Sequence, residues 1–191
     1  GTYLRAKARW LHAHTKMRHS VIAPARRGVS DPELVPLPSL PVPWNRSFRW
    51  PVSSALATRR LLRCAPDLIE AGDPYQCAWS ALDARRRLGI QALAFYHSDL
   101  PQLAGQRLGR LARIAAERYV ARLYRQFDLV LAPSRCCVAA LQSLGVRNVR
   151  RQPLGVDTAA FHPRHRDKTL RQRLGIPSDA RLLVCAGRFT R

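Results

Sequence analysis

The stretch DLIEAGDPYQCAWSALDARRRLGIQALAFYH, residues 67–97, decides the fold. It opens with a short apolar run typical of a buried strand and ends with a second one. The segment between them is helical, with Pro74 near its start and Gly89 as its stop. Two strands joined by a helix of this length favour a parallel pair with a crossover connection.

The same alternation of strands and helices continues to residue 152. The expected elements are a long amphipathic helix over residues 107–127, a strand over 128–134, a helix over 135–145 and a short strand over 146–152. Apolar strands separated by helices indicate a parallel sheet that is covered on both faces. The sequence therefore predicts an α/β fold built on a doubly wound parallel sheet, and such sheets bind ligands at the carboxyl ends of their strands.

The segment before this sheet is less regular. The sequence indicates helices over residues 2–15 and 54–65 and a short buried strand over 19–25. Residues 26–52 are rich in proline and have no helical period, which predicts irregular or edge-strand structure. A loop of this length in a compact domain is usually functional.

The sheet pattern stops at Gln152, and a turn that contains proline and glycine leads the chain away. A helical piece follows, and then an apolar run begins a new strand. We therefore expect a first domain over residues 1–152 that lacks its first strand, a linker with a helix over 153–180, and the first strand of a truncated second domain over 181–191. A parallel strand exposed at a terminus is a poor end for a finished fold, so both ends are expected to lie inside a longer protein.

The chain is strongly basic. Its formal net charge is +21, from 33 lysines and arginines against 12 acidic residues, and only three of the bases are lysines. Such a surface attracts polyanions such as nucleic acid, anionic lipid headgroups or phosphorylated substrates. A GC-rich coding sequence that favours arginine would produce the same excess, and both readings stay open. The bases are spread along the chain and no recognition motif is present, so no specific nucleic-acid partner is expected, and a basic nucleic-acid- or polyanion-binding protein remains the alternative function.

The cysteines and histidines indicate neither a disulfide framework nor a metal site. The five cysteines include no C-x-x-C pair, which is typical of a protein in a reducing cytosol. His162 and His165 lie in a segment rich in proline and arginine without a cluster of carboxylates, so no metal ion is expected there. No apolar run approaches the length of about 20 residues that crosses a bilayer, and the expected location is cytoplasmic.

Four further stretches carry a resemblance to a known family. They are FYHSDLP at residues 95–101, DLVLAPS at 128–134, PLGVDTAAFHP at 153–163 and LLVCAGRFTR at 182–191. With these stretches in this order after PDLIEAGDPY at residues 66–75, the chain resembles the retaining GT-B glycosyltransferases of family 4, and among them the bacterial α-mannosyltransferases. The likeness covers essentially the whole chain except residues 26–52.

The resemblance implies a two-domain enzyme whose active site lies in the cleft between two Rossmann-like halves. The first half holds the acceptor, and the second binds the nucleotide sugar. The implied reaction is the transfer of a hexose with retention to a lipid-linked or glycan acceptor, with GDP-mannose as the expected donor and no metal ion. Because most of the donor half would follow residue 191, the chain alone is expected to be inactive, and a non-catalytic remnant is a third interpretation.

Three residues are assigned by the resemblance. His97 corresponds to a histidine that lies beside the reacting sugar, and Arg188 to an arginine that contacts the diphosphate of the donor. Gly1 corresponds to the last glycine of a loop whose backbone N–H groups approach the donor phosphates. Without the resemblance, His97 would be an ordinary turn histidine and Arg188 a solvated strand end.

Residues near His97 are candidates for the acceptor side. Asp99 is expected to orient His97 or to bind an acceptor hydroxyl, although it would serve equally well to cap the next helix. Asp73 and Tyr75 follow a strand and are expected to line the acceptor cleft, unless they only form a turn and start a helix. Asp157 is expected to be a turn or cap residue.

The helix expected over residues 107–127 combines leucines and alanines with many arginines. Peripheral enzymes that use lipid acceptors contact anionic membranes through helices of this kind. Contact of this helix with a membrane would place the protein at the cytoplasmic face of the inner membrane. An ordinary solvated helix face explains the pattern as well.

Overall fold

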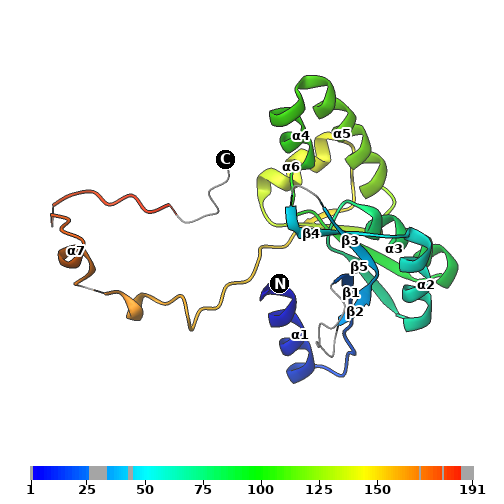
Figure 1. Ribbon diagram of the computed structural model, residues 1–191, viewed down its shortest axis with the longest axis horizontal. Coiled ribbons are helices and arrows are strands. Elements are labelled where there is room, and N and C mark those ends of the chain that lie inside the picture. Colours follow the sequence, from blue (N-terminus) through cyan, green and yellow to red (C-terminus); the bar gives the residue numbers. More distant parts are fainter. Residues whose placement is uncertain (1, 26–33, 43–44, 168, 178, 186–191) are drawn as a thin grey trace. The chain divides into compact units, whose positions relative to one another are not determined.

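The computed structural model describes residues 2–25, 34–42, 45–167, 169–177 and 179–185 (Figure 1). The chain separates into two compact units, Gly1–Leu154 and Gly155–Arg191. The larger unit contains the main sheet and every candidate site residue that the structure describes.

The main sheet has four parallel strands in the order β5-β6-β7-β8. They are β5 (Leu68–Ala71), β6 (Gln91–Phe95), β7 (Leu129–Ala132) and β8 (Val149–Arg151). The crossover connections are α3 (Gln76–Leu88), the pair α4 (Leu100–Leu108) and α5 (Arg110–Tyr124), and α6 (Arg135–Ser143). The α/β fold with a parallel sheet that the sequence predicts is therefore confirmed.

The core lies on one face of this sheet. Because neighbouring residues of a strand point to opposite faces, alternate strand residues such as Ile69, Ala92 and Val130 share that face. All three are at most 5% exposed, and they pack with apolar residues of α3, α5 and α6. Burial of this apolar surface contributes about 25 cal/mol per Å² to the stability of the fold.

The helix α1 (Thr2–His14) contacts the opposite face of the sheet. Lys7 forms an ion pair with Glu70 of β5, and the ring of Tyr3 lies 6.2 Å from the ring of Phe95 in β6. Helices therefore contact both faces, as expected for a doubly wound sheet.

Asp128, the first residue of the DLVLAPS stretch, joins three elements at the amino ends of the strands. Its carboxylate accepts two hydrogen bonds from Arg85 of α3, at 2.8 and 2.5 Å, and one of 2.8 Å from the backbone N–H of Ala92 in β6. The hydrogen-bonded Arg85 guanidinium lowers the pKa of Asp128. Asp128 is therefore a structural residue.

The proline-rich segment contributes strands of two small sheets. The strand β1 (Val21–Pro24) pairs in parallel with β2 (Leu34–Leu37), and β3 (Ser39–Val42) pairs in antiparallel fashion with β4 (Asn45–Pro51). Each sheet has only two strands, so every strand has a free edge at which a proline interrupts no ladder. The edge-strand alternative is confirmed, and the helix α2 (Ser54–Cys64) follows as expected.

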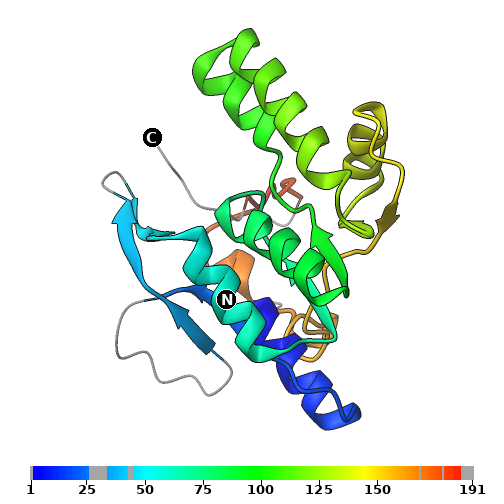
Figure 2. The ribbon, with the colours of Figure 1, turned by 90° about the vertical axis from the view of Figure 1, so that its right-hand side faces the viewer.

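The single helix expected over residues 107–127 is wrong. Gly109 has a φ of +84°, a conformation that favours glycine, and it separates α4 from α5. The side chain of Asp99 caps α4 by accepting a hydrogen bond from the backbone N–H of Gln102. The two helices form a hairpin that extends away from the sheet (Figure 2). Both helices are amphipathic, so periodicity alone does not locate the break.

The smaller unit has little regular structure. It holds the short helix η1 (Pro163–His165) and the helix α7 (Leu170–Arg173). Asp157 accepts hydrogen bonds from the backbone N–H groups of Ala159 and Ala160, which confirms the expected turn. Residues 181–185, where the sequence predicts the start of the first strand of a second domain, are exposed and irregular, and that strand stays a prediction. A strand needs a hydrogen-bonding neighbour, and no strand of the described part of this unit offers one.

Replacement of Asp128 tests its structural role. We expect Asp128→Asn to lower the free energy of unfolding by about 1 kcal/mol, because the change weakens a charge-assisted pair at a partly exposed site. The measurement is urea unfolding at neutral pH, followed by circular dichroism.

The control for this prediction is Asp83→Asn. Asp83 pairs with Arg86 and Arg87 on the surface of α3, so its replacement should change the free energy of unfolding by less than about 0.5 kcal/mol. Because the folded-state pKa of Asp128 is lowered, its stabilisation is present above the unfolded-state pKa of about 4 and is lost as the pH falls through the folded-state pKa. The difference between wild type and Asp128→Asn should shrink in acid, and a difference independent of pH would contradict the assignment.

Candidate functional site

The carboxyl ends of β5, β6 and β7 lie at one edge of the main sheet because the strands are parallel. Asp73 follows β5, His97 follows β6 and Ser134 follows β7. Ser134 caps α6 by accepting a hydrogen bond of 3.1 Å from the backbone N–H of Cys137. Asp73 and His97 are therefore the polar side chains at this edge that we consider for chemistry.

Asp73 lies in a tight turn at the end of β5. Its carboxylate accepts a hydrogen bond of 2.9 Å from the backbone N–H of Tyr75. Burial raises the pKa of Asp73, while this hydrogen bond and the positive charge of His97 act in the opposite direction. Two candidates from different loops therefore interact electrostatically.

The imidazole of His97 is exposed at the end of β6. Its ring lies 5.9 Å from the ring of Phe95, and its Nδ1 atom lies 3.2 Å from the hydroxyl of Ser98. An exposed imidazole can donate or accept a hydrogen bond with a bound ligand.

Asp99 is engaged by the fold. It accepts the capping hydrogen bond from Gln102, at 3.0 Å, and it also hydrogen-bonds with Tyr96. Burial, with the charge of Asp99 and this hydrogen bond added, raises the pKa of Tyr96. The capping alternative is thus observed, whereas no hydrogen bond joins Asp99 to His97 in the described part of the chain.

Tyr119 of α5 braces the turn after β5. Its hydroxyl donates a hydrogen bond of 2.5 Å to the carbonyl oxygen of Pro74 and accepts one of 3.0 Å from the indole N–H of Trp79. Neither Tyr119 nor Trp79 was predicted as a site residue. Their residue types could have indicated them, because the polar atom of a tyrosine or tryptophan on a packed helix face needs a hydrogen-bond partner.

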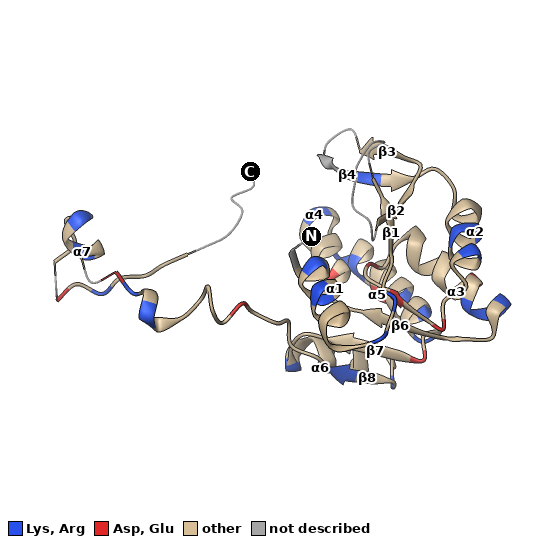
Figure 3. Ribbon diagram, turned by 90° about the horizontal axis from the view of Figure 1, so that it is seen from below, with Lys and Arg blue, Asp and Glu red and all other residues tan. Residues whose placement is uncertain are grey.

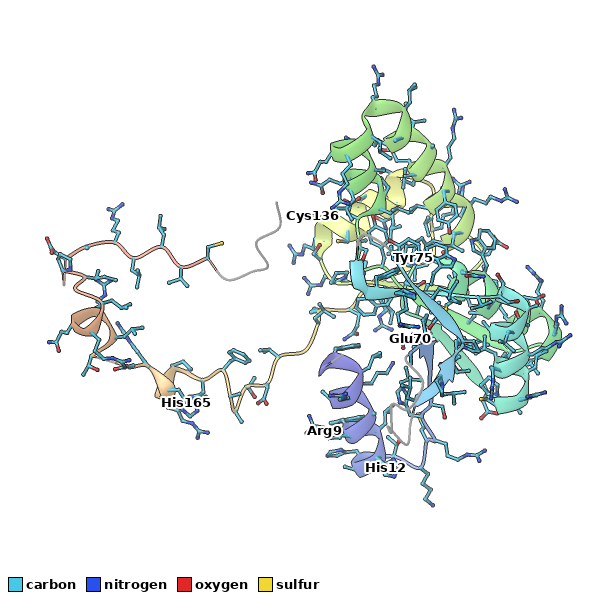
Figure 4. The ribbon with its side chains drawn as sticks, in the orientation of Figure 1. Arg9, His12, Glu70, Tyr75, Cys136 and His165 are labelled. Carbon is cyan, nitrogen blue, oxygen red and sulfur yellow. The ribbon has the colours of Figure 1, made fainter. Side chains whose placement is uncertain are left out.

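Three aromatic rings meet beside the same turn. The ring of Tyr75 lies 5.9 Å from the ring of Phe48 and 6.1 Å from the ring of Trp50, and Figure 4 places Tyr75 in the larger unit among many neighbouring side chains. Phe48 and Trp50 belong to β4 and are 41% and 47% exposed. Neither was predicted, because the proline-rich segment was marked as functional only by its length.

The two residues expected to contact the donor, Gly1 and Arg188, lie outside the described residues. Among the residues that the structure does describe, no group of three His, Cys, Asp or Glu side chains is arranged to hold a metal ion. The donor side of the site stays a prediction from the sequence.

A basic groove of about 860 Å³ lies on the helices rather than at the strand ends. Its lining includes Trp79 of α3 and four arginines, which are Arg86, Arg118, Arg122 and Arg125. Arg122 lies 6.0 Å from the ring centre of Trp79. The groove has the charge to hold an anionic group, but neither Asp73 nor His97 lines it, so the strand ends remain the candidate site for chemistry.

The family model described as Glycosyltransferase Family 4 matches residues 1–160. A GDP-mannose-dependent alpha-mannosyltransferase of Mycobacterium tuberculosis (strain CDC 1551 / Oshkosh) is 33% identical over 120 residues, which are 61% of this chain and 32% of that protein. A protein of the same name from Corynebacterium glutamicum is 29% identical over 172 residues, which are 86% of this chain and 41% of that protein.

A third relative carries a more specific name. It is a GDP-mannose-dependent alpha-(1-6)-phosphatidylinositol dimannoside mannosyltransferase of Mycobacterium tuberculosis (strain ATCC 25177 / H37Ra), 29% identical over 160 residues, which are 82% of this chain and 40% of that protein. The matched regions thus span between 32% and 41% of the length of these three relatives.

The interaction between Asp73 and His97 can be measured directly. We expect His97→Ala to raise the pKa of Asp73, because the change removes a positive charge that lowers it. The measurement is the carboxyl carbon shift of Asp73 by NMR as a function of pH. His14→Ala is the control, since His14 stacks on Trp10 at the end of α1 and should leave the Asp73 pKa unchanged. An Asp73 pKa that does not move in His97→Ala would show that the two groups do not interact.

Proposed function

The chain belongs to glycosyltransferase family 4, and on this premise we propose that the protein transfers a mannosyl group from GDP-mannose to a lipid-linked or glycan acceptor with retention. The observation that carries the proposal is the family match over residues 1–160, which includes the strand ends that bear Asp73 and His97. The names of the three relatives support mannose as the sugar and GDP as the nucleotide.

The acceptor side of the proposed reaction uses residues of the main sheet. His97 contacts the reacting sugar through its exposed imidazole. Asp73 accepts a hydrogen bond from a hydroxyl of the acceptor, and Tyr75 lines the same side. Asp99 acts as a positioning residue, because as the cap of α4 it fixes the loop that carries His97.

The donor side of the proposed reaction must neutralise charge. Departure of the nucleotide leaves a diphosphate with growing negative charge, which an arginine stabilises through charge-assisted and often bidentate hydrogen bonds. We assign this role to Arg188, with the backbone of Gly1 approaching the phosphates. The same arginine supplies at this step the positive charge that a metal ion would otherwise contribute, so the proposal includes no metal.

We also propose that the protein works at the cytoplasmic face of the inner membrane. The hairpin of α4 and α5 exposes two leucines at its tip, Leu108 at 77% and Leu111 at 82%, and Arg107 and Arg110 flank them. Apolar side chains that enter a bilayer beside basic residues that meet anionic headgroups are the usual means of peripheral attachment. In the part of the chain that the structure describes, no helix is long and apolar enough to span a bilayer.

The family match favours glycosyl transfer over nucleic-acid binding. Figure 3 shows lysines and arginines on many elements, including α1, α2 and α7. The groove lined by Arg86, Arg118, Arg122 and Arg125 is the feature that a nucleic-acid site would use.

Transfer activity tests the main proposal. We expect His97→Ala to lower kcat by at least about 100-fold, because it removes a polar contact to the reacting sugar. The measurement is mannosyl transfer from radiolabelled GDP-mannose to phosphatidylinositol mannosides and to soluble mannosides, with His14→Ala as the matched control.

Two further results bear on this proposal. Residues 1–191 alone should not transfer mannose, because the greater part of each relative lies outside the matched region. Turnover by the 191 residues alone would contradict that expectation. Absence of transfer by the protein that contains them, with every acceptor of both classes, would contradict the proposed function itself.

Membrane attachment has a separate test. We expect the double change Leu108→Ser and Leu111→Ser to reduce co-sedimentation with phosphatidylglycerol vesicles by about 10-fold or more, because burial of each leucine contributes about 1.5–3 kcal/mol. The matched control is the pair Leu170→Ser and Leu174→Ser, two exposed leucines of the α7 region. Equal sedimentation of the hairpin variant and the wild type would rule out the hairpin as the attachment site.

A further inference from the structure

We propose that Phe48, Trp50 and Tyr75 form an aromatic platform that stacks on a hexose ring of the acceptor. The proposal rests on the proposed function and deepens it, because it adds a subsite from the proline-rich segment to the loops after β5 and β6. Neither Phe48 nor Trp50 belongs to any stretch that carries the family resemblance.

The platform is built from two segments that are distant in the sequence. Phe48 and Trp50 are two residues apart on β4, and the rings of both lie near the ring of Tyr75. Tyr75 reaches them from the turn after β5, at an interplanar angle of 80° to Phe48 and 51° to Trp50. The rings are therefore tilted around one another instead of closing into a single stack.

Packing within the fold leaves much of the surface of the platform exposed to water. Phe48 and Trp50 keep 41% and 47% of their surface in water, and Leu40, the cross-strand partner of Trp50, keeps 66%. Water contact with this much adjoining apolar surface costs free energy, and such patches usually mark a binding site.

The hairpin that carries the rings is held firmly from its other side. The guanidinium of Arg49 donates hydrogen bonds to the hydroxyl of Ser39 at 2.9 Å and to the carbonyl oxygen of Ser39 at 2.5 Å. The backbone N–H of Val52 donates to the carbonyl oxygen of Pro38 at 3.0 Å. A hairpin backbone held in this way presents the rings from a fixed position, which lowers the entropy cost of binding a ligand.

The charge around the platform selects the ligand. Asp73 lies two residues before Tyr75, and its carboxylate repels phosphate groups but accepts hydrogen bonds from hydroxyls. The one arginine between Phe48 and Trp50 is turned toward Ser39. A sugar ring has an apolar C–H face for the rings and hydroxyls at its rim for Asp73, so a hexose of the acceptor fits where the donor diphosphate does not.

The test is a kinetic comparison in the protein that contains this chain. With GDP-mannose saturating, Trp50→Ala should raise the KM for α-linked mannobiose by about 10-fold, as loss of one stacked ring predicts, and leave kcat unchanged. When GDP-mannose is varied instead, its KM should stay unchanged. Trp50→Phe should restore most of the affinity. Trp10→Ala is the matched control, because Trp10 is 58% exposed on α1 and stacks on His14 instead.

The outcomes separate this inference from the proposed function. An unchanged KM for mannobiose in Trp50→Ala and in a second variant, Phe48→Ala, would overturn the inference while transfer by the wild type upholds the function. If the wild type shows no transfer, the inference is tested by titrating the protein with mannobiose. The ligand should change the tryptophan fluorescence of the wild type and leave that of Trp50→Phe unchanged. Loss of vesicle binding in Trp50→Ala with an unchanged KM for mannobiose would assign the platform to lipid and overturn the proposal.

Discussion

The strands β5 to β8 are all parallel. After each strand the chain must therefore return through a helix to the edge where that strand began, before the next strand can pair with it. This requirement places α3, α5 and α6 on the core face and brings the loops after the strands to one edge. Asp73 and His97 follow strands at that edge, while Asp128 and Arg85 join the elements at the opposite edge. The candidate site and this structural pair therefore lie at opposite edges of the sheet.

Several arginines in this fold donate hydrogen bonds that hold secondary-structure elements together, in addition to carrying surface charge. Arg85 pairs with Asp128, Arg49 holds the β3–β4 hairpin, and Arg125 donates hydrogen bonds to the carbonyl oxygens of Leu144 and Gly145 after α6. Five N–H donors in a fixed planar group suit carbonyl and carboxylate oxygens of this kind. Part of the large positive charge therefore has a structural cause that involves no polyanion.

Much of the fold was predictable because its elements are local patterns. The strands of the main sheet are short apolar runs bounded by helices, and His97 could be placed because it follows one of them. The break at Gly109 was missed because a glycine inside a helical period is often tolerated. Phe48 and Trp50 were missed because contacts between rings of distant segments leave no local pattern.

The backbone ladder of the β3–β4 hairpin is formed within its own two strands, and the hairpin contributes nothing to the ladder of the main sheet. Changes in the solvent-facing side chains of this hairpin therefore leave the registers of β5 to β8 intact. The exposed side chains of the hairpin can therefore vary independently of the main sheet. If the platform binds a hexose as proposed, divergence in these few residues would change which glycan is recognised while the scaffold stays the same.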